Sequence, residues 1–345
     1  MNDIVQSLNR AMVRQGWIGG DKFHRIGHPF VWVDGERHYF DSLSDSQSII
    51  PYISMFYEQY PTPDEILTCD YEQIKAHCEK QMRQFCKHFF PVLPLSAYNL
   101  ETNIVSNALV RTQDYCFIKT YCNDLEGKIK HLDIGSGLGN HSIYSLKAWD
   151  NSEFYALEAS PKSYAVQRHF LRFMSPSPGA YLDLIECENF EMDLQSISVE
   201  LNEKNNYRIK HCPSWFFPLI QEQSINLVTA TWVLNEVSFS GILWLMSHAS
   251  RVLRQGGYFY IRDSGKLKPN RHSINYDDLL KKIGFQEIGR LNVRNRIEYF
   301  GIPRVYQKNT DSIYSFDELV ESFLGKFAVT AHGGDYIQNW ESLPD

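Results

Sequence analysis

The sequence predicts an α/β protein, in which a mostly parallel sheet is covered by helices on both faces and is preceded by a mainly helical N-terminal region. Three observations lead to this prediction. From about residue 104, short apolar runs alternate with amphipathic helical patterns, which is typical of doubly wound sheets. A glycine-rich stretch directly follows the first of these apolar runs. The 345 residues are 43% hydrophobic and 22% charged, as in an ordered globular chain.

The first hundred residues differ from the rest of the chain. Apolar runs flank Asp34-Gly35 within residues 29–40, and this dipeptide is a strong signal for a two-residue hairpin turn. Residues 70–90 have the apolar spacing of a long helix. We therefore expect residues 1–103 to form a separate cap of helices and one hairpin.

Residues 104–308 are expected to form the α/β domain, and residues 309–345 a C-terminal helix and tail. The third strand lies either at 181–188 or at 207–211. We prefer 207–211, because it leaves a connection of ordinary length before the next strand and makes residues 176–206 an insertion. The other expected elements are strand 129–135, helix 140–149, strand 153–159, helix 160–174, strand 224–234, helix 241–253, strand 256–263, helix 276–285, and two last strands at 287–293 and 304–308.

The composition excludes several classes of protein. A net charge of −7 argues against a broad electrostatic grip on nucleic acid. No run of 18 apolar residues occurs and the first residues lack a signal-peptide layout, so we expect no membrane span and a cytoplasmic location. Seven cysteines, an odd number without a Cys-x-x-Cys pair, indicate reduced thiols rather than a disulfide framework.

The stretch HLDIGSGLGN, residues 131–140, is the strongest functional signal. Three glycines at alternate positions follow an acid, Asp133, at the end of an expected strand. Such glycines allow a backbone to approach a ligand closely. The dinucleotide fingerprint G-x-G-x-x-G would place its third glycine at position 140, where this chain has Asn140. An acid beside the loop disfavours a diphosphate and favours a cationic ligand with an ammonium and a sulfonium group.

Over residues 104–308 this arrangement resembles the class I S-adenosylmethionine (AdoMet)-dependent methyltransferases. Residues 132–140 resemble the first motif of that family, and residues 224–238 and 248–264 resemble its blocks around the fourth and fifth strands. The resemblance implies a Rossmann-like, doubly wound sheet of seven strands, with S-adenosyl-L-methionine as the cofactor. The cofactor-binding residues that it implies are Asp133, Gly135, Ser136, Gly137, Gly139, Glu158, Ser214, Trp215 and Trp232.

The implied roles of these residues differ. Glu158 is the last acid of the expected second strand, where a carboxylate accepts hydrogen bonds from two ribose hydroxyl groups. Ser214 and Trp215 stand where the family often places an acid near adenine. Trp232 either faces the methyl group, since an aromatic face attracts a sulfonium, or belongs to the core.

The methyl acceptor is expected to be a hydroxyl group of a small molecule. The expected position after the fourth strand, TWVLNEV, lacks the Asn/Asp-Pro-Pro-aromatic box of nucleic-acid amino-methyltransferases, and the chain is acidic. An N-terminal cap before a class I core is similar to the layout of sugar O-methyltransferases, which favours a sugar or glycosylated metabolite. A hydroxyl benefits from a general base, for which His272 and Glu236 are the candidates. No tight cluster of metal ligands is evident, and Asp263, at the end of the fifth strand, is a further titratable group near this region.

Three other functions remain open from the sequence. The chain could methylate a nitrogen of a small molecule or peptide. It could be a nicotinamide-dependent oxidoreductase, although Asn140 disfavours that function. It could also be a methyltransferase-like scaffold that keeps the fold without catalysis.

Overall fold

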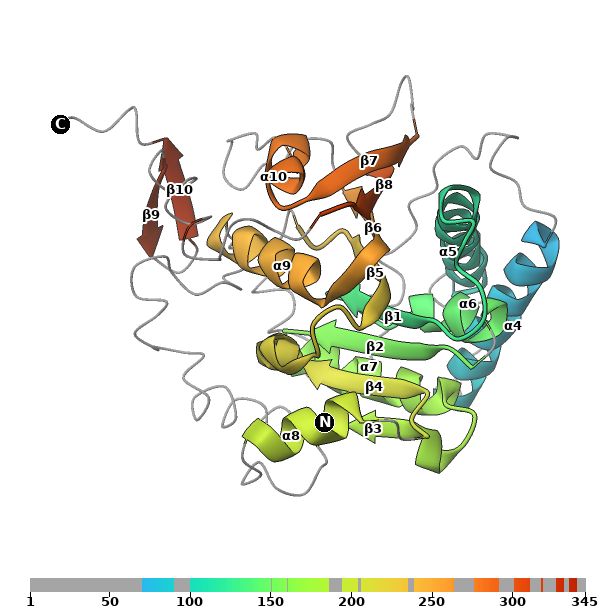
Figure 1. Cartoon of the computed structure of the whole chain (residues 1–345). Coiled ribbons are helices and arrows are strands. Elements are labelled where there is room, and N and C mark those ends of the chain that lie inside the picture. Colours follow the sequence, from blue (N-terminus) through green and yellow to red (C-terminus); the bar gives the residue numbers. More distant parts are fainter. Residues whose placement is uncertain are drawn as a thin grey trace.

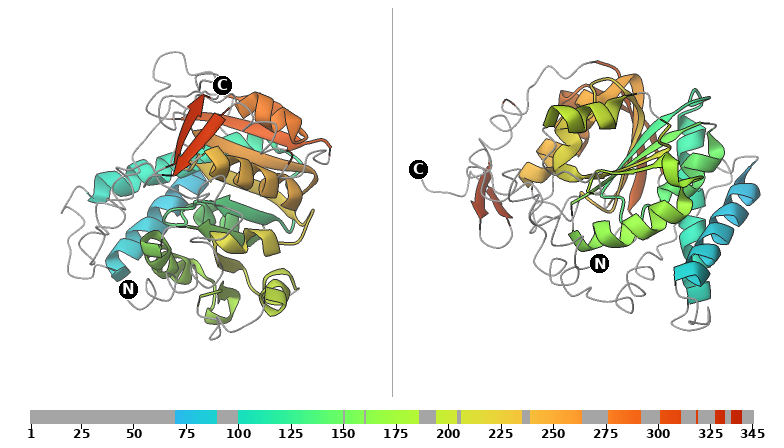
Figure 2. Two further views of the ribbon diagram at one scale, coloured as in Figure 1. Left: turned by 90° about the vertical axis from the view of Figure 1, so that its left-hand side faces the viewer. Right: turned by 90° about the horizontal axis from the view of Figure 1, so that it is seen from below.

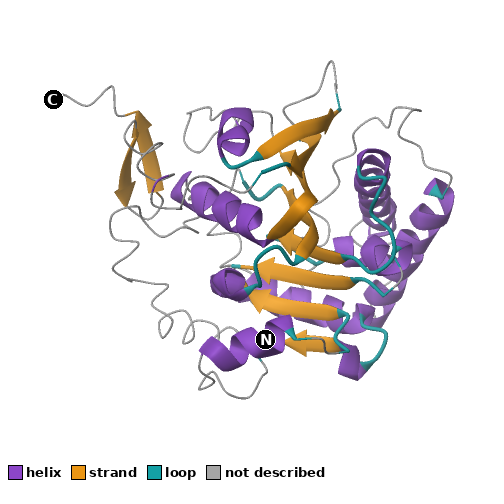
Figure 3. Cartoon of the chain, in the orientation of Figure 1, coloured by secondary structure: helices purple, strands orange, loops and turns teal. Residues whose placement is uncertain are grey.

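A single large sheet with helices on both faces forms the centre of the protein (Figures 1 and 3). The computed structural model describes residues 70–89, 100–149, 151–159, 161–185, 194–203, 206–234, 239–263, 276–291, 301–310, 318, 327–331 and 335–339. The expected hairpin around Asp34-Gly35 lies outside these residues. The α/β prediction is confirmed.

The elements alternate between strands and helices along most of the described chain. In order, they are α4 (Tyr71–Phe89), α5 (Leu100–Tyr121), β1 (Lys130–Ile134), α6 (His141–Ala148), β2 (Glu153–Glu158), α7 (Pro161–Met174), η4 (Pro178–Ala180), β3 (Tyr181–Asp183), α8 (Leu194–Asn202), β4 (Ile209–Pro213), η5 (Ser214–Leu219), β5 (Ile225–Thr231), α9 (Phe239–Val252), β6 (Leu253–Asp263), α10 (Tyr276–Lys282), β7 (Phe285–Arg290), β8 (Ile302–Lys308), β9 (Phe327–Ala331) and β10 (Asp335–Asn339).

The main sheet has eight strands in the order β3-β4-β2-β1-β5-β6-β8-β7, so the prediction of seven strands was wrong by one. The preferred third strand is confirmed, because β4 pairs with β2 in parallel. The additional strand is β3, which pairs with β4 at the edge of the sheet and belongs to the expected insertion. The alternative at 181–188, which was not preferred, overlaps β3. A tertiary contact helps to hold β3 in place: Tyr164 on α7 donates to the Asp183 carboxylate at 2.7 Å.

Strands β3, β4, β2, β1, β5 and β6 are parallel, whereas β8 runs antiparallel to both of its neighbours, β6 and β7. The predicted last pair of strands is thereby confirmed. From β1, the chain continues on one side to β2 and β4, and later returns to the other side of β1 with β5. Ligands of open parallel sheets bind at such a reversal of strand order, beyond the carboxyl ends of the strands.

The two faces of the sheet carry different helices (Figure 2). Helices α4 to α7 belong to one hydrophobic cluster, and α8, η5, α9 and α10 belong to the other. The predicted helix at 70–90 is confirmed as α4, whose buried residues Ile74, Cys78, Met82 and Phe85 form one stripe against α5. Helix α5 is buried on nearly all sides between α4 and the sheet, and the boundary expected between residues 103 and 104 falls inside it.

The C-terminal region contains two strands that were not predicted from the sequence. Strands β9 and β10 form a separate two-stranded antiparallel sheet in the expected tail. The first of them begins at Phe327, within residues 309–345, where the sequence predicts a helix and a tail. Gly333-Gly334 between two alternating runs is the hairpin signal that could have revealed this pair. Most of the expected helix lies outside the described residues.

Two expectations from composition can be compared with the structure. The cysteines that the structure describes are buried and form no disulfide with one another: Cys78, Cys86, Cys116, Cys122 and Cys212. None of the described helices combines the length and apolar character needed to cross a membrane.

Candidate active site

The glycine loop, residues 135–140, connects the carboxyl end of β1 to α6. Gly135, Gly137 and Gly139 all have left-handed backbone conformations, with φ angles of 60°, 55° and 85°. Glycine adopts these angles without the steric penalty that a Cβ atom imposes. The amides of Gly135 and Ser136 donate to the carbonyl of Leu157 on β2, at 2.9 and 3.3 Å, so the loop turns toward β2 as it leaves the sheet.

Two of the three glycines are required by packing within the protein. A Cβ atom on Gly135 would lie 2.3 Å from Cγ2 of Val233, and one on Gly139 would lie 2.8 Å from Cδ2 of Leu171. The sequence reading assigned all three glycines to contact with a ligand. The structure gives Gly135 and Gly139 a second reason, namely close approach to the turn after β5 and to α7.

Gln167 on α7 makes hydrogen bonds to the glycine loop and was not among the predicted site residues. Its Nε2 donates to Oγ of Ser136 at 2.6 Å and to the carbonyl of Gly137 at 2.8 Å, and its side chain is fully buried. A buried amide that fixes two loop residues restricts the conformations of the loop. Gln167 could have been identified from the sequence as an uncharged polar residue on the face of α7 that also carries Tyr164 and Leu171.

Glu158, Ser214 and Trp215 lie at neighbouring strand ends, as the sequence predicted. Glu158 is the last residue of β2 and pairs in register with Pro213, the last residue of β4. Ser214 and Trp215 follow at once in η5, and all three side chains are largely buried. Within the described part of the chain, the buried Oγ of Ser214 has no hydrogen-bond partner. An acid and an unsatisfied hydroxyl group therefore lie together beside the glycine loop.

Trp232, directly after β5, has an unusual backbone. Its φ angle is 58°, a conformation that is strained for a large side chain and that clusters at functional sites. Two hydrogen bonds maintain this backbone conformation. The Trp232 amide donates to the Arg262 carbonyl at 3.0 Å, and the Leu234 amide donates to the Asp263 carboxylate at 2.9 Å. The indole Nε1 of Trp232 is buried and has no hydrogen-bond partner among the described residues.

Asp263 lies at the end of a strand, as expected from the sequence. It is the last residue of β6 and only 1% exposed, and its carboxylate supports the turn after β5. The candidate bases His272 and Glu236 lie outside the described residues, and their role stays a prediction. Among the residues that the structure describes, no group of three or more His, Cys, Asp or Glu side chains is arranged to hold a metal ion.

Asp133 is buried and hydrogen-bonded to other side chains of the protein, which its position in the sequence did not predict. Its side chain is 2% exposed, and its Oδ1 accepts hydrogen bonds from Thr229 Oγ1 at 2.6 Å and from His141 Nδ1 at 3.0 Å. One carboxylate oxygen therefore faces β5 and α6 and not the loop. Contact of the other oxygen with a ligand stays a prediction.

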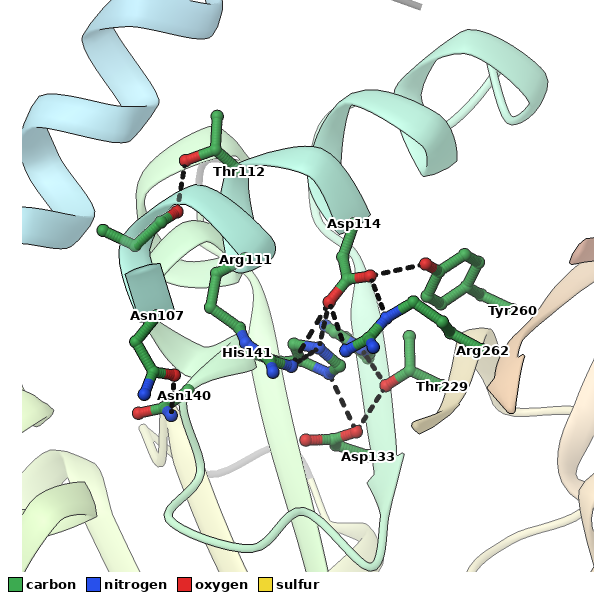
Figure 4. A network of polar contacts seen from close by, with 12 residues as sticks. Asn107, Arg111, Thr112, Asp114, Asp133, Asn140, His141, Thr229, Tyr260 and Arg262 are labelled. Atoms are coloured by element: carbon green, nitrogen blue, oxygen red, sulfur yellow. Dashed lines mark hydrogen bonds and ion pairs between the residues drawn. The ribbon is translucent and has the colours of Figure 1, made fainter. Parts of the chain in front are cut away.

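Asp133 belongs to a buried charge cluster between the sheet and α5 (Figure 4). We define this cluster as Arg111, Asp114, Asp133, His141 and Arg262, all of them at most 7% exposed. At its centre, Asp114 accepts from Arg262 Nε at 2.7 Å and from Tyr260 at 2.5 Å, and it forms an ion pair with Arg111 Nη1 at 3.2 Å. Burial by itself raises the pKa of the Asp114 carboxyl, but Arg262, His141 and Arg111 together hold that pKa well below its usual range. Asp114 is therefore charged in the native protein.

Comparisons with known proteins give the chain no family. No protein-family model matches it, and no curated protein matches its sequence. Among solved structures, it is similar to a candidate sarcosine dimethylglycine methyltransferase from Galdieria sulphuraria, with 11% identity, a TM-score of 0.42, and coverage of 67% of this chain and 98% of that one.

Two further solved structures have different described activities. Phosphoethanolamine N-methyltransferase 1 of Haemonchus contortus, in complex with phosphoethanolamine and S-adenosylhomocysteine, is 16% identical, with a TM-score of 0.38 and coverage of 74% of this chain and 54% of that one. The [4+2]-cyclase SpnF is 13% identical, with a TM-score of 0.40 and coverage of 60% and 82%. At such low identities and TM-scores, these likenesses carry no argument about activity. The case for a function rests on the residues at the strand ends.

Proposed function

We propose that the chain is an AdoMet-dependent methyltransferase whose donor site lies at the carboxyl ends of β1, β2, β4 and β5. One observation carries the proposal. A loop with three left-handed glycines follows the central strand β1, beside the buried Glu158 at the end of β2, where the strand order reverses. Open parallel sheets bind their ligands at this place.

The residues at this edge fit AdoMet. Glu158 offers two carboxylate oxygens for the ribose hydroxyl groups. The unsatisfied Oγ of Ser214, together with Trp215, offers a polar and flat surface for the adenine ring. The ring of Trp232 offers an aromatic face to a sulfonium. When bound, AdoMet supplies a methyl group on a sulfonium, which is already a good leaving group. The protein then has to align the acceptor and exclude water.

A nicotinamide-dependent oxidoreductase fits less well. Its fingerprint needs a small residue at position 140, where helix and strand pack closely. Asn140 is 6% exposed, and its Nδ2 donates to Oδ1 of Asn107 on α5 at 3.1 Å. This side chain fills the position and joins the loop to α5.

The acceptor in this proposal is a hydroxyl group of a small molecule, most simply a sugar or a glycosylated metabolite, deprotonated by His272 or Glu236. Its support is the acidic composition and the sequence after β5, which lacks the amino-methylating box. An assay of a metabolite extract with isotope-labelled AdoMet tests it. A labelled methyl group on oxygen is the expected product, and a methyl group on nitrogen or carbon would contradict the hydroxyl acceptor but keep the methyltransferase.

We expect Glu158→Ala to weaken the binding of S-adenosylhomocysteine by about 1.5–3 kcal/mol, because a charged hydrogen-bond acceptor is lost. Isothermal titration calorimetry measures this change. Glu153→Ala is the matched control: Glu153 is a buried acid at the opposite end of the same strand, where it pairs with Lys128 at 2.7 Å. The control should lower stability and leave affinity unchanged. Wild-type protein that binds NAD and not S-adenosylhomocysteine would overturn the proposed function.

A further inference from the structure

The orientation of Asp133 is set by two donors from different elements. Thr229 comes from β5 and His141 from the first turn of α6. A carboxylate only accepts, so Nδ1 of His141 carries the proton of this contact. Asp133 lies two residues before Gly135, and the two donors therefore fix the chain at the point where the glycine loop begins.

The opposite nitrogen of the His141 ring is also engaged. Nη1 of Arg111 lies 2.7 Å from Nε2, and Oδ2 of Asp114 lies 3.3 Å from the same atom. Arg111 only donates and the Asp114 carboxylate only accepts, so the protonation state of Nε2 selects between these two partners, which both lie on α5. The ring is thus held at both nitrogens, with one end at β1 and the other at α5, as Figure 4 shows.

Burial by itself lowers the pKa of His141, but Asp133 and Asp114 together raise that pKa above its ordinary value, so the cluster holds closely paired charges. Asp114 and Asp133 contribute two negative charges, and Arg111 and Arg262 contribute two positive charges. Burying such a cluster carries a desolvation penalty that apolar side chains of similar volume would avoid. This favours a role in fixing geometry over a role in adding stability. The geometry concerned is that of the loop which starts next to Asp133.

We propose that His141 is a positioning residue for the methyl donor: by donating to Asp133, with its ring anchored on α5, it sets the conformation in which the glycine loop binds AdoMet. This inference rests on the proposed function. It assigns a role to a side chain whose hydrogen bond to Asp133 fixes the start of the loop, and it explains why α5 carries charged side chains on a face that packs against the sheet.

Two substitutions of His141 separate its two contacts. The amide nitrogen of Asn matches the place of Nδ1, so His141→Asn can keep the donor to Asp133 and loses the anchor on Arg111. Gln extends to the place of Nε2, so His141→Gln keeps the anchor and loses the donor to Asp133. We expect His141→Gln to weaken S-adenosylhomocysteine binding about tenfold, and His141→Asn to weaken it by no more than about threefold.

Thr229→Val tests the same orientation with a smaller change, because it removes the second donor to Asp133 and keeps every charge in the cluster. It should weaken binding severalfold even if the His141 variants fail to fold. Lys210→Met is the control for loss of a buried charge elsewhere: Lys210 is fully buried on β4 and contacts Tyr155 and Leu201. It should lower the melting temperature without changing affinity.

Calorimetry on folded protein, with melting temperatures measured in parallel, distinguishes the outcomes. A wild-type protein that does not bind S-adenosylhomocysteine refutes the proposed function. A wild-type protein that binds, together with His141→Gln and Thr229→Val proteins that melt lower but bind equally well, refutes the positioning role alone. Equal losses in His141→Asn and His141→Gln would also refute it, because the donor to Asp133 would then not be the contact that matters.

Discussion

Replacing Asp114 by Asn is expected to lower the free energy of unfolding by about 3–5 kcal/mol, because the change leaves buried positive charge without its partner. Arg262 and Arg111 both contact the Asp114 carboxylate, and both side chains are buried. Urea denaturation followed by circular dichroism measures the change. The substitution preserves the shape of the side chain, so a loss of this size reports charge and not a cavity.

Glu79→Gln is the control for this prediction. Glu79 pairs with Arg83 at 3.0 Å on α4, and their side chains are 19% and 33% exposed. Partly exposed pairs of this kind contribute at most about 1 kcal/mol. Similar losses in the two variants would show that the buried cluster is no more important for stability than a surface pair.

The pH dependence of the Asp114 effect follows from the low pKa of its carboxyl group. A carboxyl group whose pKa is lower in the folded than in the unfolded state stabilises the protein above its unfolded pKa, and loses this effect only as the pH falls through the folded value. The difference between wild type and Asp114→Asn should therefore not decrease between about pH 8 and about pH 5, and it should increase as His141, whose pKa Asp114 helps to raise, becomes protonated.

Replacing Gly137 by Val is expected to weaken S-adenosylhomocysteine binding by at least about a hundredfold, equivalent to about 2.8 kcal/mol. Gly137 has a φ angle of 55°, which a β-branched residue adopts only with strain, and its carbonyl is held by Gln167. A valine would shift the middle of the loop or place its methyl groups where the ligand approaches. Calorimetry on protein that is folded by circular dichroism measures the effect.

Gly127→Val provides a matched control. Gly127 has a φ angle of 68°, in the turn before β1, and a Cβ atom there would meet nothing within 4 Å. The control carries the same backbone strain, about 1–2 kcal/mol, without lying in the loop. It should lower stability and leave affinity unchanged. Unchanged binding in Gly137→Val would remove the glycine loop from the donor site.

Much of the fold was predictable because its signals are local. Strands β1, β2, β5 and β6 are apolar runs bounded by helices, and a strand buried on both faces reads as such a run. The place of β3 in the sheet and the burial of α5 were not predictable in this way. Residues 181–188 are a candidate strand in the sequence, but only the pairing with β4 adds β3 to the edge of the sheet. Helix α5 is covered from both sides, so apolar and polar residues do not separate on its surface.

The candidate site also contains some features that the local sequence predicts and others that depend on tertiary contacts. The glycine loop, the acid at the end of β2 and their order along the chain could be predicted from the sequence, because each is a property of a few consecutive residues. The hydrogen bonds from Thr229 and His141 to Asp133, from Gln167 to the loop and from Arg262 to Asp114 became visible only in the folded chain. Thr229 and Arg262 lie far along the sequence from Asp133 and Asp114, the residues that they contact. Contacts of this kind arise from the pairing of strands and the docking of helices on them, and no local periodicity encodes which polar side chains the packed sheet brings together.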